Sequence, residues 1–271
     1  MTKYYLTECL VIKNENQYLH EHITEDLKAG IEHFYIYDDK SDVPVEEYLK
    51  NNYPDLLQYC TINIIERSKD WDPELERQTN VYTADFLKIY GSETKWCAFT
   101  DTDEIWEGDL QTFLKENEDK PGFIFEGLVH GANGHAWENG KTMKENFYDH
   151  VVIRWSYRKL IVQTELVERQ QAHIVVFKDH TLEAVYKPKC DITLHHYFYR
   201  SLEEFVKKIK RGLMNERLII QMWMFFIDNK IDQKEIDEVF KKYNVNMTTH
   251  SPNGCNTLYS WSAKIESESK K

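Results

Sequence analysis

Apolar and polar positions follow two different rhythms along the first part of the chain. Residues 6–12 form a mostly apolar run, which predicts a strand. Apolar side chains recur at every fourth position over residues 19–27, which predicts a helix with one buried face that ends at Gly30. An aromatic and β-branched run over residues 33–37 predicts a second strand. The chain therefore opens with strand, helix and strand.

The same order continues to about residue 100. The pattern predicts a short helix over residues 45–49, a strand over 59–65, a helix over 78–90 and a buried strand over 96–99. Strands that alternate with helices are typical of parallel βαβ units. We therefore expect an α/β fold with a mixed, mostly parallel central sheet flanked by helices.

The second half has a less regular pattern. It predicts four strands and three helices: strands over residues 123–128, 151–155, 174–177 and 192–198, and helices over 201–211, 216–226 and 232–243. Ser201 is expected to cap the first of these helices. Residues 222–226 are apolar on all sides, which favours a buried helix and leaves peripheral contact with a membrane as the alternative.

Composition and charge exclude several classes of protein. The 271 residues are 41% apolar and 14% aromatic, enough for a sizeable core. With 34 Lys+Arg and 46 Asp+Glu, the net charge is 34 − 46 = −12, which argues against nucleic-acid binding. No apolar run is long enough to span a bilayer, and the five scattered cysteines indicate a reduced, cytoplasmic protein.

Polar clusters follow three of the predicted strands. They lie at residues 13–15, at 38–39 and at 101–104. In open α/β sheets, ligands bind beyond the carboxyl ends of the strands. We therefore expect these clusters to line a binding site.

The third cluster carries two carboxylates, Asp101 and Asp103, directly after the buried strand. Such a pair suits a hard divalent cation that also contacts a diphosphate, although a solvated acidic turn would have the same spacing. His195 and His196 lie on a later strand, where adjacent side chains face opposite sides. At most one of them can therefore complete a metal site.

Basic residues follow that histidine pair. Lys208 and Arg211 lie on the predicted helix after it, where they form either a solvated face or contacts to phosphate. The sequence contains no Gly-rich phosphate loop, no G-x-S-x-G elbow and no C-x-x-C zinc pattern.

Taken in order, these motifs resemble the family 92-like (DUF23-related, family-2-like) glycosyltransferases. The resemblance begins with Lys13-Asn14-Glu15 and the Gly30 to Asp38 segment, and continues through Gln78 and Trp96 to Ile105. It ends with the glycine-rich loop at residues 131–135 and the segment from His196 to Gly212. Asp39 stands where the family more often has Asn.

The resemblance implies a GT-A fold and a metal-dependent enzyme. It implies a domain over residues 1–212, a packed helical extension over 213–265 and a flexible tail over 266–271. The donor would be a nucleotide-diphosphate sugar, with a UDP-sugar favoured, and the acceptor a glycan or similar hydroxyl compound of polysaccharide biosynthesis. The assigned roles are nucleotide binding by Asn14, Glu15, Asp38 and Asp101, binding of Mn²⁺ or Mg²⁺ by Asp101, Asp103 and His196, and diphosphate contacts by Lys208 and Arg211.

An inverting reaction, which the resemblance suggests, needs a base for the acceptor hydroxyl. The sequence does not identify it; Glu138 and Asp149 are candidates because they follow the glycine-rich loop. Two alternatives remain: a haloacid-dehalogenase-like phosphatase, whose first motif resembles residues 99–103, and an inactive nucleotide- or sugar-binding relative.

Overall fold

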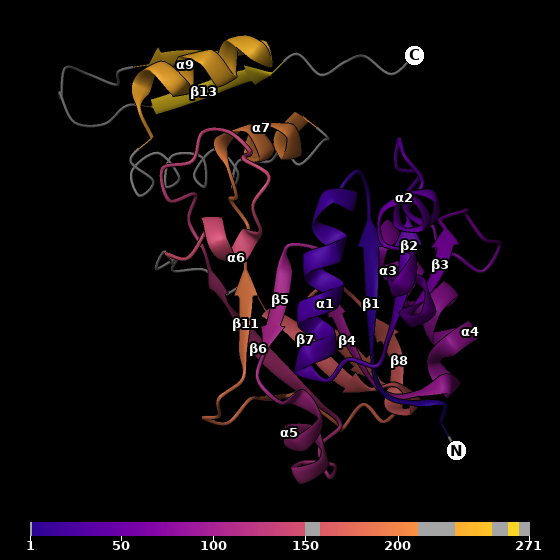
Figure 1. Cartoon of the computed structure of the whole chain (residues 1–271). Coiled ribbons are helices and arrows are strands. Elements are labelled where there is room, and N and C mark those ends of the chain that lie inside the picture. The colour runs from indigo at the N-terminus through magenta and orange to yellow at the C-terminus, as the bar shows by residue number, and fades with distance from the viewer. Residues whose placement is uncertain (1, 150–157, 211–230, 251–259, 266–271) are drawn as a thin grey trace. The chain divides into compact units, whose positions relative to one another are not determined.

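The computed structural model describes residues 2–149, 158–210, 231–250 and 260–265. The strand expected over 151–155, the helix expected over 216–226, the tail and Arg211 lie outside these ranges. Contacts within the chain define two compact units (Figure 1). The first comprises Met1–Leu128 and Ile153–His196, and the second Val129–Val152 and Tyr197–Lys271. The domain boundary expected at residue 212 stays a prediction.

The first unit holds the large sheet and the helices that cover it. Its strands are β1 (Tyr4–Ile12), β2 (His33–Asp38), β3 (Cys60–Ile64), β4 (Thr94–Thr100), β5 (Glu104–Glu107), β6 (Gly122–Val129), β7 (Arg158–Gln163), β8 (Val167–Gln170), β9 (Val175–Phe177), β10 (Val185–Tyr186) and β11 (Thr193–His196). Its helices are η1 (Asn16–Tyr18), α1 (Leu19–Ala29), α2 (Val45–Asn52), η2 (Pro54–Tyr59), α3 (Arg77–Asn80), η3 (Val81–Leu87), α4 (Lys88–Tyr90), η4 (Gly91–Glu93), α5 (Leu110–Glu116) and η5 (Thr164–Leu166).

The second unit is mainly helical in its described part. It contains α6 (Met143–Asn146), α7 (Leu202–Lys210), α9 (Gln233–Lys242) and the antiparallel pair β12 (Val245–His250) and β13 (Ser260–Ile265). Ser201 caps α7 as expected, because its hydroxyl accepts a hydrogen bond from the Glu204 amide at 3.2 Å. The β12–β13 pair was not predicted from the sequence.

The central sheet is mixed and mostly parallel around β1, as expected. Its strand order is β3-β2-β1-β4-β7-β6-β11-β5, and β10 pairs with β6. Strand β1 is parallel to both β2 and β4, and β2 is parallel to β3. The carboxyl ends of these four strands therefore meet at one edge of the sheet.

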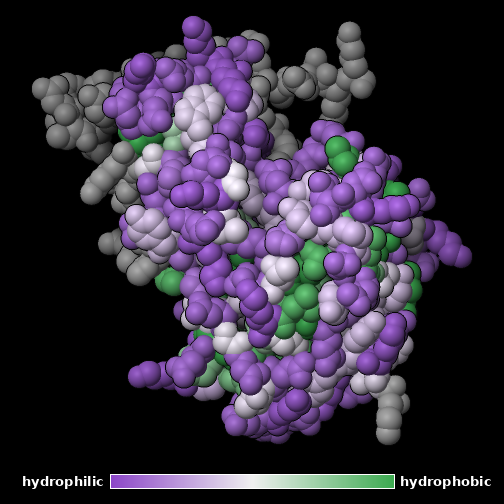
Figure 2. Space-filling view, in the orientation of Figure 1, coloured by the Kyte–Doolittle hydropathy of each residue, from purple (hydrophilic) through white to green (hydrophobic). Residues whose placement is uncertain are grey.

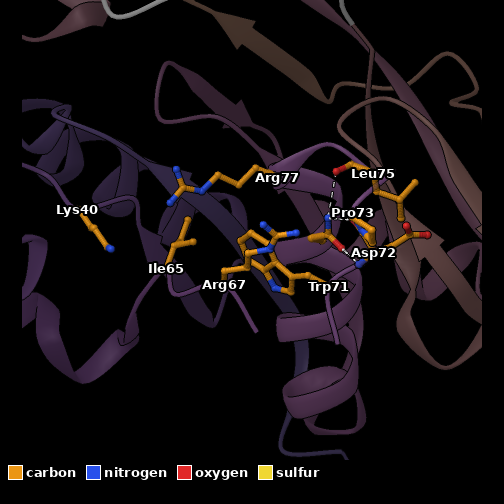
Figure 3. A pocket seen from close by; sticks show the side chains of 9 residues that line it. Lys40, Ile65, Arg67, Trp71, Asp72, Pro73, Leu75 and Arg77 are labelled. Atoms are coloured by element: carbon orange, nitrogen blue, oxygen red, sulfur yellow. Dashed lines mark hydrogen bonds between the residues drawn. The ribbon is translucent and has the colours of Figure 1, made fainter. Parts of the chain in front are cut away.

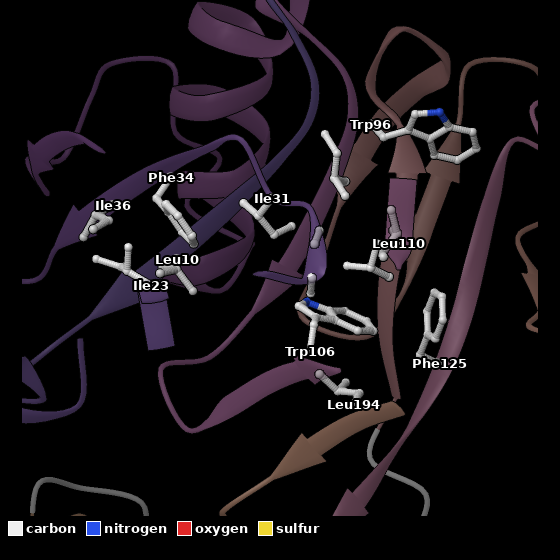
Figure 4. Packing of buried hydrophobic residues seen from close by; sticks show 14 of the residues in the cluster. Leu10, Ile23, Ile31, Phe34, Ile36, Trp96, Trp106, Leu110, Phe125 and Leu194 are labelled. Carbon is white, nitrogen blue, oxygen red and sulfur yellow. The ribbon is translucent and has the colours of Figure 1, made fainter. Parts of the chain in front are cut away.

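Alternating side chains give the sheet two apolar faces. Leu10, Phe34 and Trp96 face one core, which α1, α2 and α5 cover (Figure 4). Cys9, Tyr35 and Phe99 face the other core, which η3 covers with Val81, Tyr82 and Phe86. The visible surface is largely hydrophilic (Figure 2). None of the described helices is long and apolar enough to cross a membrane.

The predicted elements of the first hundred residues are confirmed, with shifted ends. The helix expected over 78–90 consists of α3, η3 and α4, and its middle part has π-helical hydrogen bonding. Gly30 ends α1 with a φ of 104°, a backbone conformation that favours glycine. Strands β5 and β7 were not predicted, and both turn out to border the acidic cluster.

Three ionisable residues lie in the core between β1 and α1. Glu8, His22 and Asp26 are fully buried. His22 Nε2 lies 3.1 Å from Glu8 Oε2 and 3.5 Å from Asp26 Oδ2. Thr100 and the Trp106 indole donate hydrogen bonds to the other Glu8 oxygen, and the Trp106 amide donates one to Asp26 at 2.8 Å.

Burial alone would raise the pKa of Glu8, but His22 and Thr100 lower it overall. Burial and the neighbouring Glu8 raise the pKa of Asp26 well above its ordinary value. The folded cluster therefore favours the ionised form of Glu8 and the protonated form of Asp26.

These protonation states predict unequal effects of two conservative substitutions. Glu8→Gln removes the charge that His22 faces and should destabilise the protein by about 3–5 kcal/mol. Asp26→Asn replaces a carboxyl that is already neutral and should cost less than about 1 kcal/mol. Urea unfolding at pH 7 measures both changes. Equal losses, or a larger loss for Asp26→Asn, would contradict the assignment.

Candidate functional site

The acidic cluster forms a tight turn between β4 and β5. The Glu104 amide donates a hydrogen bond to the Asp101 carbonyl at 2.9 Å, and the Asp101 amide donates one to Glu104 Oε2 at 2.8 Å. The first bond closes the turn, and the second holds the Glu104 carboxyl against its backbone. Asp103 and Glu104 are buried, whereas the Asp101 side chain is 42% exposed.

His196 joins this turn through strand pairing. In the antiparallel pair of β11 and β5, His196 lies opposite Glu104. His196 Nε2 is 3.9 Å from Asp103 Oδ1, and its Nδ1 is 3.6 Å from Glu104 Oε1. His195 lies on the opposite side, with its Nε2 2.6 Å from Glu107 Oε2. The histidine that matches the family motif is therefore the one beside the carboxylates.

The pair of Asp103 and His196 fits a divalent cation. Ligand atoms at about 2.1 Å from one ion can be separated by up to about 4.2 Å, which accommodates the distance of 3.9 Å. His196 directs Nδ1 toward Glu104 and Nε2 toward Asp103. A carboxylate beside the second ring nitrogen commonly orients metal-bound histidines. The structure thus brings Asp103 and His196 together as the resemblance implied.

Asp101 has two further neighbours that the sequence did not reveal. Lys159 of β7 places its ammonium 2.6 Å from Asp101 Oδ2 and 3.0 Å from Glu104 Oε2, and its side chain is 1% exposed. Gln78 of α3 donates a hydrogen bond to Asp101 Oδ1 at 3.3 Å. Both carboxylate oxygens of Asp101 are therefore held by donors.

Lys159 and its two acidic neighbours shift one another's pKa values. Burial alone would lower the pKa of Lys159, but Asp101 and Glu104 raise it overall. Burial alone would raise the pKa of Asp101, but Lys159 lowers it below its ordinary value. Burial raises the pKa of Glu104 to about 8 despite Lys159. Asp101 and Lys159 are thus an ion pair at neutral pH.

A pocket of about 380 Å³ lies at the ends of β2 and β3 (Figure 3). Three of its nine lining residues are cationic: Lys40, Arg67 and Arg77. The Trp71 ring also lines it, and its indole donates to both oxygens of Asp85 at 3.0 and 3.1 Å. The pocket thus combines positive charge with a fixed aromatic side chain.

The pocket and the acidic turn share one helix. Arg77, the first residue of α3, lines the pocket, and the next residue, Gln78, contacts Asp101. Asp39 holds Arg77 in a two-point ion pair, with distances of 2.9 and 2.5 Å. Asp39, at the position where the family more often has Asn, therefore holds one of the residues that line the pocket in place.

The expected nucleotide-binding residues shape the loops beside this pocket. Asp38 is buried, and its two oxygens accept hydrogen bonds from the amides of Ser41 at 2.8 Å and Val45 at 3.1 Å. Asn14 exchanges two hydrogen bonds with Asp42, at 2.7 and 3.2 Å. Glu15 precedes η1, and its carbonyl accepts from Tyr18. Contact of any of them with a nucleotide stays a prediction.

The remaining expected site residues belong to the second unit. Lys208 donates to the Phe198 carbonyl at 3.3 Å and lies over the Phe198 ring. Glu138 accepts a hydrogen bond from the Ser201 hydroxyl at 2.7 Å, and burial raises its pKa. Asp149 is exposed. Arg211 lies outside the described residues.

A second set of potential metal ligands lies in the core. The ligand atoms of Glu8, His22 and Asp26 lie within 4.8 Å of one another. Their ligand atoms already contact one another, with His22 Nε2 between Glu8 and Asp26, so the partly exposed acidic turn is the stronger candidate for a cation site.

Comparison with known proteins finds a partial match to a glycosyltransferase. A glycosyltransferase family 92 protein from Ricinus communis is 31% identical over 104 residues, which are 38% of this chain and 16% of that protein. The match confirms the resemblance found in the motifs. The chain spans only about a sixth of the length of this curated relative. No family model matches the chain.

Solved structures show more distant similarity. HddC from Yersinia pseudotuberculosis is 10% identical, with a TM-score of 0.45 over 76% of this chain and 99% of that one. Residues 1–349 of TarS from S. aureus are 11% identical, with a TM-score of 0.41 over 87% of this chain and 69% of that one. At these scores the description of the fold rests on the strand order itself.

The hydrogen bonds of Asp38 predict a structural contribution. Asp38→Ala leaves the amides of Ser41 and Val45 without their acceptors and should reduce the free energy of unfolding by about 1–3 kcal/mol. Asp42→Ala, in an exposed part of the same loop, should change it by less than about 0.5 kcal/mol. Urea unfolding compares the two. A neutral Asp38→Ala would contradict this role.

Proposed function

We propose that this chain is a metal-dependent glycosyltransferase that takes a hexose from a nucleotide-diphosphate donor, with a UDP-sugar favoured. The acceptor is a hydroxyl group of a glycan or similar compound, and the reaction inverts the configuration at the anomeric carbon of the transferred sugar. The observation that carries this proposal is the convergence of Asp103 and His196 beside Asp101 at the carboxyl edge of the sheet. The similarity to a family 92 glycosyltransferase supports the reaction class.

The donor would extend from the pocket at the ends of β2 and β3 to the acidic turn after β4. The pocket lined by Lys40, Arg67, Arg77 and Trp71 offers an aromatic ring for a base and cations for phosphates. Asp103 and His196, together with Asp101 of the same turn, would hold Mn²⁺ or Mg²⁺, which when bound neutralises charge on the departing diphosphate. Asn14, Glu15 and Asp38 complete the proposed nucleotide site, and Lys208 and Arg211 the proposed diphosphate contacts.

The acceptor's proton needs a base in this proposal. Glu138 and Asp149 remain the candidates. Burial raises the pKa of Glu138, which makes its carboxylate a stronger proton acceptor than an ordinary glutamate. A cytoplasmic location and a role in polysaccharide biosynthesis are part of the same proposal.

The donor class can be tested by a thermal-shift screen of UDP, GDP and CDP, each with Mn²⁺ and with EDTA. We expect UDP with Mn²⁺ to raise the melting temperature, because a ligand that binds the native state stabilises it by about 2.7 kcal/mol at a hundredfold over its Kd. UDP-sugar hydrolysis is the matching activity assay. No shift with any nucleotide, or release of phosphate from p-nitrophenyl phosphate instead, would contradict the proposal.

The two histidines provide a matched pair for the metal site. His196→Gln should weaken Mn²⁺ binding at least about tenfold, since even residues that only orient ligands contribute that much. His195→Gln, which affects a side chain paired with Glu107, should leave the Mn²⁺ affinity unchanged. Calorimetric titration of Mn²⁺ into each purified variant measures this. Equal affinities would remove His196 from the metal site.

A further inference from the structure

Lys159 reaches the acidic turn from the strand beside it. Strand β7 runs antiparallel to β4, with Leu160 opposite Phe99. Lys159, one residue earlier, therefore lies level with the point where β4 gives way to the turn. Its ammonium contacts both Asp101 and Glu104.

Burial of the Lys159 ammonium costs free energy unless an opposite charge lies close to it. A buried ammonium loses the hydration that stabilises it in water, and only close opposite charges offset that loss. Here the ionised Asp101 lies at 2.6 Å, and the Glu104 carboxyl, whose pKa is about 8, lies at 3.0 Å. One of them, Asp101, is partly exposed and belongs to the proposed donor site.

The position of the Lys159 ammonium affects the acidic turn in two ways. Its Oδ2 is occupied by Lys159 and its Oδ1 accepts from Gln78, so the carboxylate has a fixed orientation. The ammonium also cancels one negative charge next to Asp103. The turn therefore attracts a divalent cation less strongly than the same carboxylates would without Lys159.

We propose that Lys159 is a positioning residue that fixes Asp101 and moderates the cation affinity of the acidic turn, so that the cation binds firmly only together with the donor diphosphate. This inference rests on the proposed function. Ions such as Mg²⁺ are commonly held by one or two carboxylates plus substrate phosphates, which agrees with a weak site in the free protein. Removal of the ammonium should strengthen binding of the cation alone and slow transfer.

Lys159→Met in the Glu104→Gln background gives the cleanest test. Glu104→Gln removes the fully buried carboxylate, so the double variant leaves only the partly exposed Asp101 without its cation and should fold. Against Glu104→Gln alone, the double variant should bind Mn²⁺ about tenfold more tightly without nucleotide. Its kcat for donor hydrolysis should fall about a hundredfold, since small misplacements at a reacting site have effects of that size.

Lys159→Arg in the otherwise unchanged protein is the conservative control. It keeps the charge, so its Mn²⁺ affinity should stay within about twofold of the unaltered protein. Unchanged or weaker Mn²⁺ binding by the double variant, or an unchanged kcat, would overturn the proposal. If the unaltered protein hydrolyses no sugar nucleotide, the proposed function fails, whereas the Mn²⁺ titration still reports separately whether Lys159 moderates the cation affinity.

Discussion

The parallel pairing of β1 with β2 on one side and β4 on the other is the constraint on which the rest of the site depends. It brings the ends of these strands to one edge, so that loops far apart in the sequence meet there. The same pairing places Glu8 of β1 against Thr100 at the end of β4. The strand pairing therefore fixes both the carboxyl edge of the sheet and the position of the buried Glu8 side chain.

Much of this arrangement could be predicted from the sequence because it is repetitive and local. Continuous apolar and aromatic runs predicted β1, β2 and β4, and the motif of Asp101 and Asp103 follows the last of them directly. Strand alternation limited the histidine pair to one candidate metal ligand, and the register of β11 against β5 places His196 opposite Glu104. These features depend on neighbours within a few residues or on one strand pair.

Lys159 could not be predicted in the same way. A lysine beside Arg158 has the sequence pattern of an exposed strand end, and only the antiparallel register of β7 shows it to be buried. Glu8 similarly interrupts an apolar strand, and its partners His22 and Asp26 come from a different element. Charges that are neutralised at long range leave no local pattern, because the compensating residue can stand anywhere in the chain.

The buried group of Glu8, His22 and Asp26 also bears on how this sequence can diverge. The Glu8 carboxylate is tolerated in the apolar core because His22, Thr100 and the Trp106 indole contact it. Loss of Glu8 or His22 by single substitution leaves an uncompensated group, whereas replacement of all three by apolar residues leaves none. We therefore expect relatives of this chain either to keep Glu8 together with His22 or to exchange both, so that these two positions vary together through descent, whereas Asp26 can change alone.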